Sequence, residues 1–257
     1  MRTRLFAARA KAPRPARIPA NTRLYAIGDV HGRLDLLREL RATIRADAER
    51  GLGLTKIVHL GDYVDRGLES RGVLDALCSE PLAGFESVFL MGNHDEMMLR
   101  FLTDPSVGPN WFFNGGDATL YSYGIDSEPA PGEGSPARFA RLSRELNERL
   151  PDAHQAFLRS LRLAHVEGDY YFVHAGVRPG VPLERQTPED QLWIREDFLG
   201  SGHDFGKIVV HGHTPTIDAD VRSNRIGIDT GAYFSGVLTC LVLEDDRRRL
   251  IQTAPRH

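Results

Sequence analysis

The sequence predicts an α/β fold in which short buried strands alternate with helices. Three apolar runs, at residues 24–27, 57–60 and 88–91, have the length and composition of buried strands, and a glycine follows each of them. Amphipathic stretches follow the first two runs, which indicates parallel strands joined by right-handed crossovers. Apolar runs return after residue 160, and spacing alone leaves a single doubly wound sheet open as an alternative to two sheets.

The helices are expected mainly in the first 160 residues. A helix over residues 33–50 carries apolar side chains at helical spacing, and a second helix is expected around residues 70–78. Residues 97–160 contain further helical stretches, with a loop by composition at residues 126–136 and a break near Pro151. We expect residues 97–160 to form a helical insert or cap over the sheet.

The second half of the chain is expected to consist mostly of strands. Residues 161–166 and 170–173 flank a tight-turn sequence and predict a hairpin. Further strands are expected at residues 208–210, 225–228 and 237–243, and the charged run at residues 245–249 is expected to be a solvated turn. Together, residues 21–253 are expected to form a single domain.

Length, charge and cysteine content restrict the class of protein. A chain of 257 residues is long enough to bury a core without stabilising disulfides or structural metals. Its net charge of -3 gives no indication of a nucleic-acid partner. No apolar run is long enough to span a membrane. Cys78 and Cys240 each lie in an apolar segment, which indicates buried thiols and a reducing, cytoplasmic location. We expect a monomer.

Residues 1–20 differ in composition from the rest of the chain. They contain six arginines and lysines, three prolines and no acidic residue. We expect a flexible basic tail, and a transit peptide is the alternative.

Residues of metal-binding types follow the three N-terminal strands. Asp29 and His31 follow the first run, Asp62 follows the second, and Asn93 follows the third. Parallel strands deliver residues at their carboxyl ends to one edge of a sheet, so these side chains are expected to meet. Mixed oxygen and nitrogen donors suit manganese, iron or zinc better than calcium, and the absence of cysteine argues against a structural zinc site.

Three motifs carry a resemblance to a known family. They are Asp-Val-His-Gly at 29–32, Gly-Asp-Tyr-Val-Asp-Arg-Gly at 61–67 and Gly-Asn-His-Asp at 92–95. In this order they resemble the calcineurin-like metallophosphoesterases, and in particular the phosphoprotein phosphatase family of Ser/Thr phosphatases. The resemblance covers residues 23–243. It implies two mixed β-sheets packed as a sandwich, flanked by helices, with a dinuclear metal centre at the loop ends.

The resemblance also implies which residues bind the two divalent ions, with manganese expected and iron or zinc as alternatives. One ion would bind Asp29, His31 and Asp62. The other would share Asp62 as a bridge, and its remaining ligands would be Asn93, His174 and His213. The family's Gly-His frame selects His213 rather than His211, and Pro215 stands where the wider superfamily has a second histidine.

The catalytic residues implied by the resemblance lie beside these ligands. His94 would act as general acid and Asp65 would orient it, although Asp65 could instead cap the following turn. Arg66 and Arg195 would bind the substrate phosphate, and Tyr233 would lie at the rim. Residues 111–120 resemble a rim segment of bacterial members, with a helix ending at residues 115–116 as the alternative.

The expected function is metal-dependent phosphoester hydrolysis. The resemblance favours a Ser/Thr protein phosphatase, in which metal-bound hydroxide attacks a phosphate monoester in line without a phosphoenzyme. A symmetrical bis(5′-nucleosyl)-tetraphosphatase is an alternative, and a non-catalytic scaffold is an alternative from another class. The expected partner is therefore a phosphorylated protein or a small phosphoester. Pro215 argues against a nuclease.

Overall fold

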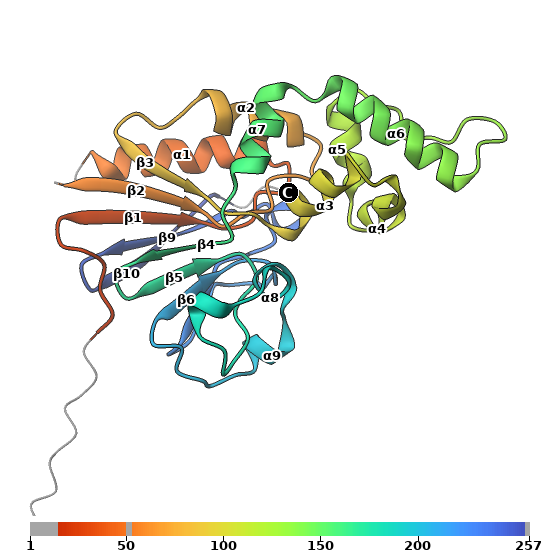
Figure 1. Ribbon diagram of the computed structural model, residues 1–257. Coiled ribbons are helices and arrows are strands. Elements are labelled where there is room, and N and C mark those ends of the chain that lie inside the picture. Colours follow the sequence, from red (N-terminus) through yellow and green to blue (C-terminus); the bar gives the residue numbers. More distant parts are fainter. Residues whose placement is uncertain (1–14, 50–52, 255–257) are drawn as a thin grey trace, which may run out of the picture.

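The computed structural model describes residues 15–49 and 53–254, which form two five-stranded mixed sheets. The first sheet has the order β10-β9-β1-β2-β3, and the second has the order β4-β5-β6-β8-β7. Figure 1 shows the two sheets stacked in layers, with helices outside the first sheet. Two mixed sheets with flanking helices confirm the expected fold class and exclude a single doubly wound sheet.

Parallel strands form the centre of the first sheet. β1 (Thr22–Ile27), β2 (Leu54–His59) and β3 (Phe85–Phe89) are parallel, as the crossover pattern predicts. On the other side of β1, β9 (Thr239–Glu244) runs antiparallel to β1, and β10 (Arg247–Gln252) runs antiparallel to β9. The chain therefore returns to its first sheet after the strands of the second sheet.

The strand β10 corrects one expectation from the sequence. Residues 247–249 were expected in a solvated turn, but the turn is shorter and these arginines begin an edge strand whose Arg247 pairs with Glu244. Backbone pairing needs no apolar side chains, and charged residues are common on exposed edge strands because they oppose further pairing. The charged composition therefore concealed the strand.

The second sheet places the remaining strands. β4 (Ala164–Glu167) and β5 (Tyr170–Val173) form the predicted hairpin, and β5, β6 (Ile208–His211) and β8 (Arg225–Gly227) are parallel. The short β7 (Asp220–Val221) pairs antiparallel to β8. A buried apolar layer that includes Val58 and Leu241 of the first sheet and Phe172 and Ile226 of the second joins the two sheets.

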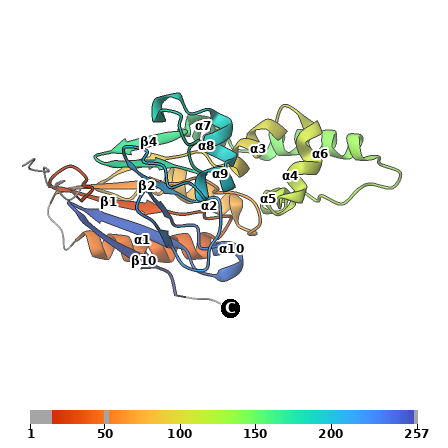
Figure 2. The same cartoon turned by 90° about the horizontal axis from the view of Figure 1, so that it is seen from below.

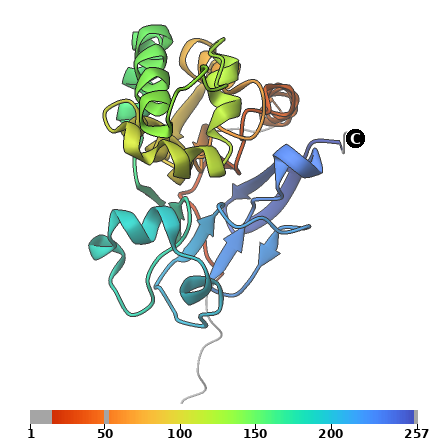
Figure 3. The same cartoon turned by 90° about the vertical axis from the view of Figure 1, so that its right-hand side faces the viewer.

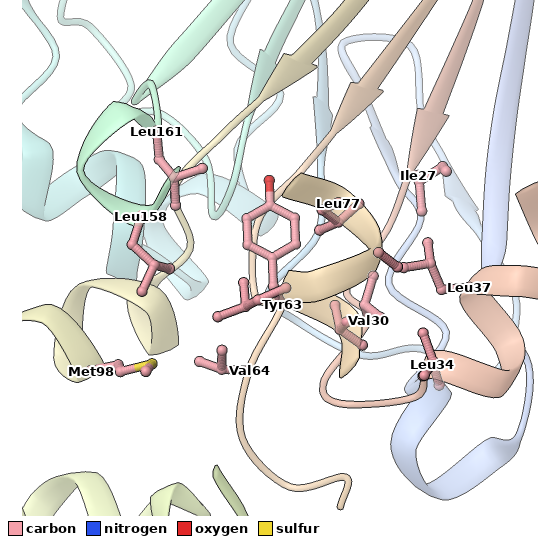
Figure 4. Close-up of a cluster of buried hydrophobic side chains, with 14 of the residues drawn as sticks. Ile27, Val30, Leu34, Leu37, Tyr63, Val64, Leu77, Met98, Leu158 and Leu161 are labelled. Carbon is pink, nitrogen blue, oxygen red and sulfur yellow. The ribbon is translucent and has the colours of Figure 1, made fainter. Parts of the chain in front are cut away.

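Helices cover the outer face of the first sheet. α1 (Leu34–Ala48) and α2 (Ser70–Ser79) pack there with α7 (Asp152–Ser160), and their apolar faces form one large core with Ile27 and Tyr63. Figure 4 shows Leu77 of α2, Leu158 and Leu161 around the Tyr63 ring. The residue at which the sequence predicted the end of α1, residue 50, lies outside the described residues.

The helical insert extends from one end of the sheets. It contains α3 (Asn93–Phe101), a 3₁₀ turn (Pro105–Val107), α4 (Gly108–Phe113), α5 (Gly116–Ser122) and α6 (Ser135–Arg149), and α7 follows a break at residues 150–151. Figure 2 shows α4, α5 and α6 projecting beyond the sheets. Seen from that end in Figure 3, the insert lies opposite the loops that carry α8 (Pro188–Trp193), α9 (Glu196–Leu199) and a 3₁₀ turn (Leu183–Arg185).

The N-terminal segment and the cysteines add two details. Within the described part of the expected tail, Ile18 is buried and its N–H donates to the Asp245 carbonyl, while the Arg17 N–H donates to Asp169. Residues 1–14 lie outside the described residues.

Cys240 is buried and Cys78 is half-buried rather than buried, and both are free thiols. No helix in the described ranges is both long and apolar enough to cross a membrane.

Candidate metal centre

The carboxyl ends of strands from both sheets meet at one place. Asp29 follows β1, Asp62 follows β2, and Asn93 begins α3 after β3, near the point where the insert leaves the sheet in Figure 1. From the second sheet, His174 follows β5 and His213 follows β6. All five side chains are buried. The sheets therefore bring together residues that the strand-end rule selected after β1, β2 and β3 and the two histidines that the family resemblance implied.

The backbone is strained where these loops meet. Seven non-glycine residues of the described chain have a positive φ, and five of them are predicted site residues. These five are His31, Asp62, Asp65, Arg66 and His213. Such conformations cost about 1–3 kcal/mol each and concentrate at functional sites, because the surrounding fold must hold them. The strain thus marks the same place as the polar side chains.

Two groups of ligand-type atoms share Asp62. Donor atoms of His31, Asp62 and His94 lie within 4.8 Å of one another, and so do those of Asp62, His174 and His213. One carboxylate oxygen of Asp62 lies 3.4 Å from His31 Nε2 and 3.4 Å from His174 Nε2. This position between two imidazoles is where a bridging carboxylate would lie.

Asn93 completes the second group. Its Oδ1 lies 3.0 Å from His174 Nε2 and 2.8 Å from His213 Nδ1, so three donor atoms converge there. The first group has His94 in it, whereas Asp29 is not a member of either group. Asp29 instead accepts a hydrogen bond from the His213 backbone N–H through Oδ2, at 3.0 Å. His94, the predicted proton donor, therefore lies beside the predicted ligands His31 and Asp62.

Hydrogen bonds fix which imidazole nitrogens face the centre. His31 Nδ1 lies 2.8 Å from the Val64 carbonyl and His174 Nδ1 lies 3.0 Å from the Leu60 carbonyl. Carbonyls only accept, so Nδ1 carries the proton and Nε2 is left with a free lone pair. His211 does not take part, because its Nδ1 faces the Gly212 carbonyl and its Nε2 faces buried Arg225.

The charges at this place favour a divalent cation. Burial and the negative charges of Asp229 and Asp62 raise the pKa of Asp29 well above its usual range. Asp29 Oδ1 and His213 Nε2 are buried with no hydrogen-bond partner. A cation would relieve the repulsion and would give Asp29 Oδ1 a partner, whereas a cation in the second group would face His213 Nδ1 rather than Nε2. The oxygen and nitrogen donors therefore fit the divalent metals that the sequence predicted.

His94 and Asp65 form a close buried pair. His94 Nδ1 lies 2.7 Å from Asp65 Oδ2, and both side chains are almost completely buried. Burial alone would lower the pKa of His94, but the carboxylates of Asp62 and Asp65 outweigh it and raise that pKa. Asp65 does not act as the turn cap that was its alternative; its N–H donates to the Ser70 and Thr119 hydroxyls while its carboxylate faces His94.

The two predicted phosphate-binding arginines lie beside the centre. Arg66 Nη2 is 3.2 Å from His94 Nε2, and its guanidinium lies over the Tyr233 ring at 4.6 Å. Tyr233, which is 37% exposed, also touches the His31 ring edge-on. Arg195 donates to Thr214 Oγ1 at 3.2 Å, next to His213. The structure thus places Arg66, Tyr233 and Arg195 around the predicted ligands.

Two carboxylates that the sequence reasoning did not select lie in the same place. Asp95 is fully buried and accepts hydrogen bonds from the backbone N–H groups of Asp62, Tyr63 and Gly92. Asp229, whose pKa burial raises to about 6, contacts Asp29. Asp229 directly follows the predicted strand at residues 225–228, so the strand-end rule could have found it.

Comparisons with known proteins agree with this geometry. The model of the calcineurin-like phosphoesterase family matches residues 22–236. An asymmetrical bis(5′-nucleosyl)-tetraphosphatase PrpE of Bacillus thuringiensis is 26% identical over 234 residues, 84% of this chain and 88% of the relative. Shewanella-like protein phosphatase 2 of Arabidopsis thaliana is 30% identical over 203 residues, 67% of this chain and 51% of the relative.

The structural comparison supports the same fold. A crystal structure of a cold-active protein tyrosine phosphatase superposes with a TM-score of 0.56 at 17% identity, over 91% of this chain and 81% of that one. The family model spans most of the chain and includes the insert, the whole second sheet and strands β1, β2 and β3 of the first sheet. The resemblance seen in the three motifs is therefore confirmed, and this chain belongs to the calcineurin-like phosphoesterase family.

Proposed function

We propose that this phosphoesterase is a Ser/Thr protein phosphatase that hydrolyses phosphate monoesters directly, without a phosphoenzyme. The observation that carries the proposal is the buried His94–Asp65 pair, which lies 3.2 Å from Arg66. A serine or threonine alkoxide is a strongly basic leaving group, so its departure needs a proton. A histidine held by a carboxylate next to a phosphate-binding arginine is suited to supply that proton.

The other residues support the same reaction. Arg66 and Arg195 would hold the phosphate oxygens by charge-assisted hydrogen bonds from two sides. We assign one ion to Asp29, His31 and Asp62, and the other to Asp62, Asn93, His174 and His213, with manganese as the first choice. When bound, two such cations lower the pKa of a bound water to roughly 7 and neutralise charge on the phosphate. Tyr233 would keep Arg66 at the rim through its ring.

A second candidate is a bis(5′-nucleosyl)-tetraphosphatase. The name of the PrpE relative favours it, because that relative matches 84% of this chain. In that reaction the leaving group is a nucleotide phosphate, which departs without a proton donor. The two candidates therefore differ in how much they require His94.

The test compares substrates on purified, manganese-loaded protein. Phosphoserine and phosphothreonine peptides are run beside a phosphotyrosine peptide and diadenosine tetraphosphate, and phosphate and nucleotide products are measured. Faster turnover of the phosphoserine and phosphothreonine peptides is expected. Faster cleavage of the dinucleotide would instead establish the second candidate, and its products would separate symmetrical from asymmetrical cleavage. If the protein binds two metals and turns over none of these substrates, the result would favour a non-catalytic scaffold.

The variant His94→Asn tests the observation that carries the proposal. Loss of a general acid lowers kcat by about 10²–10⁴-fold for a poor leaving group, and metal content should stay unchanged. p-Nitrophenyl phosphate has a weakly basic leaving group and should lose much less. Wild-type activity of the variant on the phosphoserine peptide would exclude His94 as the acid.

A further inference from the structure

The helical insert reaches Asp65 with two buried side chains. Trp111 on α4 donates from Nε1 to the Asp65 carboxylate, at 2.9 Å to Oδ2 and 3.1 Å to Oδ1. Thr119 on α5 donates from Oγ1 to Asp65 Oδ1 at 2.7 Å and accepts from the Asp65 backbone N–H at 2.9 Å. Asp65, Trp111 and Thr119 are each fully buried.

We propose that Trp111 and Thr119 are positioning residues, which hold the Asp65 carboxylate so that it orients His94. This inference rests on the proposed function, because it assigns the insert a part in the proton donation by His94. The insert then does more than extend the fold beyond one end of the sheets. It supplies the groups that fix the acid's orientation.

The geometry supports positioning because the two oxygens of the Asp65 carboxylate contact different hydrogen-bond donors. Oδ1 faces Thr119, Oδ2 faces His94, and the Trp111 N–H lies between them. With donors on both oxygens, rotation of the carboxylate about its last bond would break at least two hydrogen bonds. A carboxylate without these donors would also be costly at this position, since Asp65 is fully buried.

The same part of the insert holds the neighbouring residue. The Arg66 N–H donates to the Gly115 carbonyl at 3.1 Å, at the junction of α4 and α5. A Cβ on Gly115 would lie 3.0 Å from Arg66 Cγ, so the insert and the arginine are closely packed. Trp111, Gly115 and Thr119 thus fix two consecutive residues, the proposed orienting carboxylate and the proposed phosphate ligand.

Packing alone gives no reason for the polar contacts. The Trp111 ring packs on Phe101 with centroids 4.7 Å apart, and a phenyl ring would keep much of that contact. A valine at position 119 would keep nearly the same volume as threonine. The proposal explains the two polar atoms, Trp111 Nε1 and Thr119 Oγ1. Substitutions can remove each of these atoms while most of the packing stays.

The test uses Thr119→Val, which removes the hydroxyl, and Thr119→Ser, which keeps it. Trp111→Phe removes the indole N–H in the same way. We expect kcat on a phosphoserine peptide to fall about 10–100-fold in Thr119→Val and Trp111→Phe, because small displacements of a catalytic group cost that much. Activity on p-nitrophenyl phosphate should fall less than about threefold, and Thr119→Ser should stay near wild type on both substrates.

Two controls separate positioning from general damage. Thr103→Val makes the same change elsewhere on the insert, where the exposed hydroxyl donates to the Arg100 carbonyl, and it should leave both activities unchanged. In a His94→Asn background, Trp111→Phe should cause no further loss, because residues that act as a unit are not additive. Equal losses on both substrates, or an undiminished loss in the His94→Asn background, would overturn the inference.

A third measurement does not depend on turnover. The proton between His94 Nδ1 and Asp65 should give a downfield NMR signal in wild type and Thr119→Ser, and faster exchange should broaden it in Thr119→Val. An unchanged signal in Thr119→Val, together with unchanged kcat, overturns the positioning role. If His94→Asn itself shows no difference between the two leaving groups, the general-acid part of the proposed function fails instead.

Discussion

Replacement of Asp95 by asparagine should destabilise the protein more than the matching replacement of Glu96 by glutamine. Asp95 Oδ2 accepts from the N–H groups of Asp62 at 2.8 Å and Gly92 at 2.9 Å, and Oδ1 accepts from Tyr63 at 3.0 Å. One fully buried side chain therefore joins the loop after β2 to the start of α3. Both of these loops carry predicted metal ligands.

The magnitude follows from the contacts that asparagine keeps. Its single carbonyl oxygen can retain the two bonds at the Oδ2 position, but its NH₂ group then faces the Tyr63 N–H and leaves that donor unpaired. Three bonds to a charged acceptor at about 2 kcal/mol each become two neutral bonds at about 1 kcal/mol each. Burial and the negative charge of Asp62 raise the pKa of Asp95, and relief of that repulsion offsets part of the loss. We expect a net cost of about 2–4 kcal/mol.

The assay is urea unfolding of chelator-treated Asp95→Asn and wild type, so that metal binding does not contribute to the difference. Glu96→Gln is the matched control, because it makes the same kind of change one residue later at a partly exposed side chain. It should change the free energy of unfolding by less than about 0.5 kcal/mol. A cost below about 1 kcal/mol for Asp95→Asn, or one equal to that of Glu96→Gln, would refute the role of the three N–H contacts.

Two further predictions concern the bridge and pH. Asp62→Asn should lower metal content measured by mass spectrometry from two ions per chain to one or fewer, and retention of two would exclude the bridge. At Asp47, burial raises the carboxyl pKa, but hydrogen bonds from Tyr25 and Arg249 outweigh it and leave that pKa below its usual range. Asp47→Asn should therefore cost about 1–2 kcal/mol at pH 7. This cost should shrink as pH falls below about 4 and through the lower folded-state pKa, and unfolding midpoints that stay equally separated at low pH would contradict it.

The parts of the fold that depend on local pattern could be predicted from the sequence. The apolar runs at 24–27, 57–60 and 88–91 overlap β1, β2 and β3, although the strands begin earlier than these runs, and the break between α6 and α7 falls at Pro151 as expected. β10 was not predicted, because it is an edge strand held by backbone pairing to β9 and its first half consists of three arginines. The pairing of two sheets came from the family resemblance rather than from spacing.

The candidate site, like the fold, could be predicted only in part from the sequence. Ligand-type residues at strand ends were found because each strand delivers its last residue to the same edge, and Asp229 obeys that rule although the sequence reasoning did not select it. The Trp111–Asp65 contact follows no such rule. It joins residues 46 positions apart, on a helix and a loop, and only the packing of the insert brings them together.

The strained loops link these two observations. Asp62, Asp65 and Arg66 all have positive φ within five residues, and no glycine occupies those positions. Such a loop keeps its shape only if many contacts hold it: Asp95 holds the N–H of Asp62, Thr119 holds that of Asp65, and the Gly115 carbonyl holds that of Arg66. Two of these three contacts come from α4, α5 and their junction. The insert and the strained loop therefore depend on each other, so sequence changes in α4 or α5 should alter activity even where they touch neither metal nor substrate.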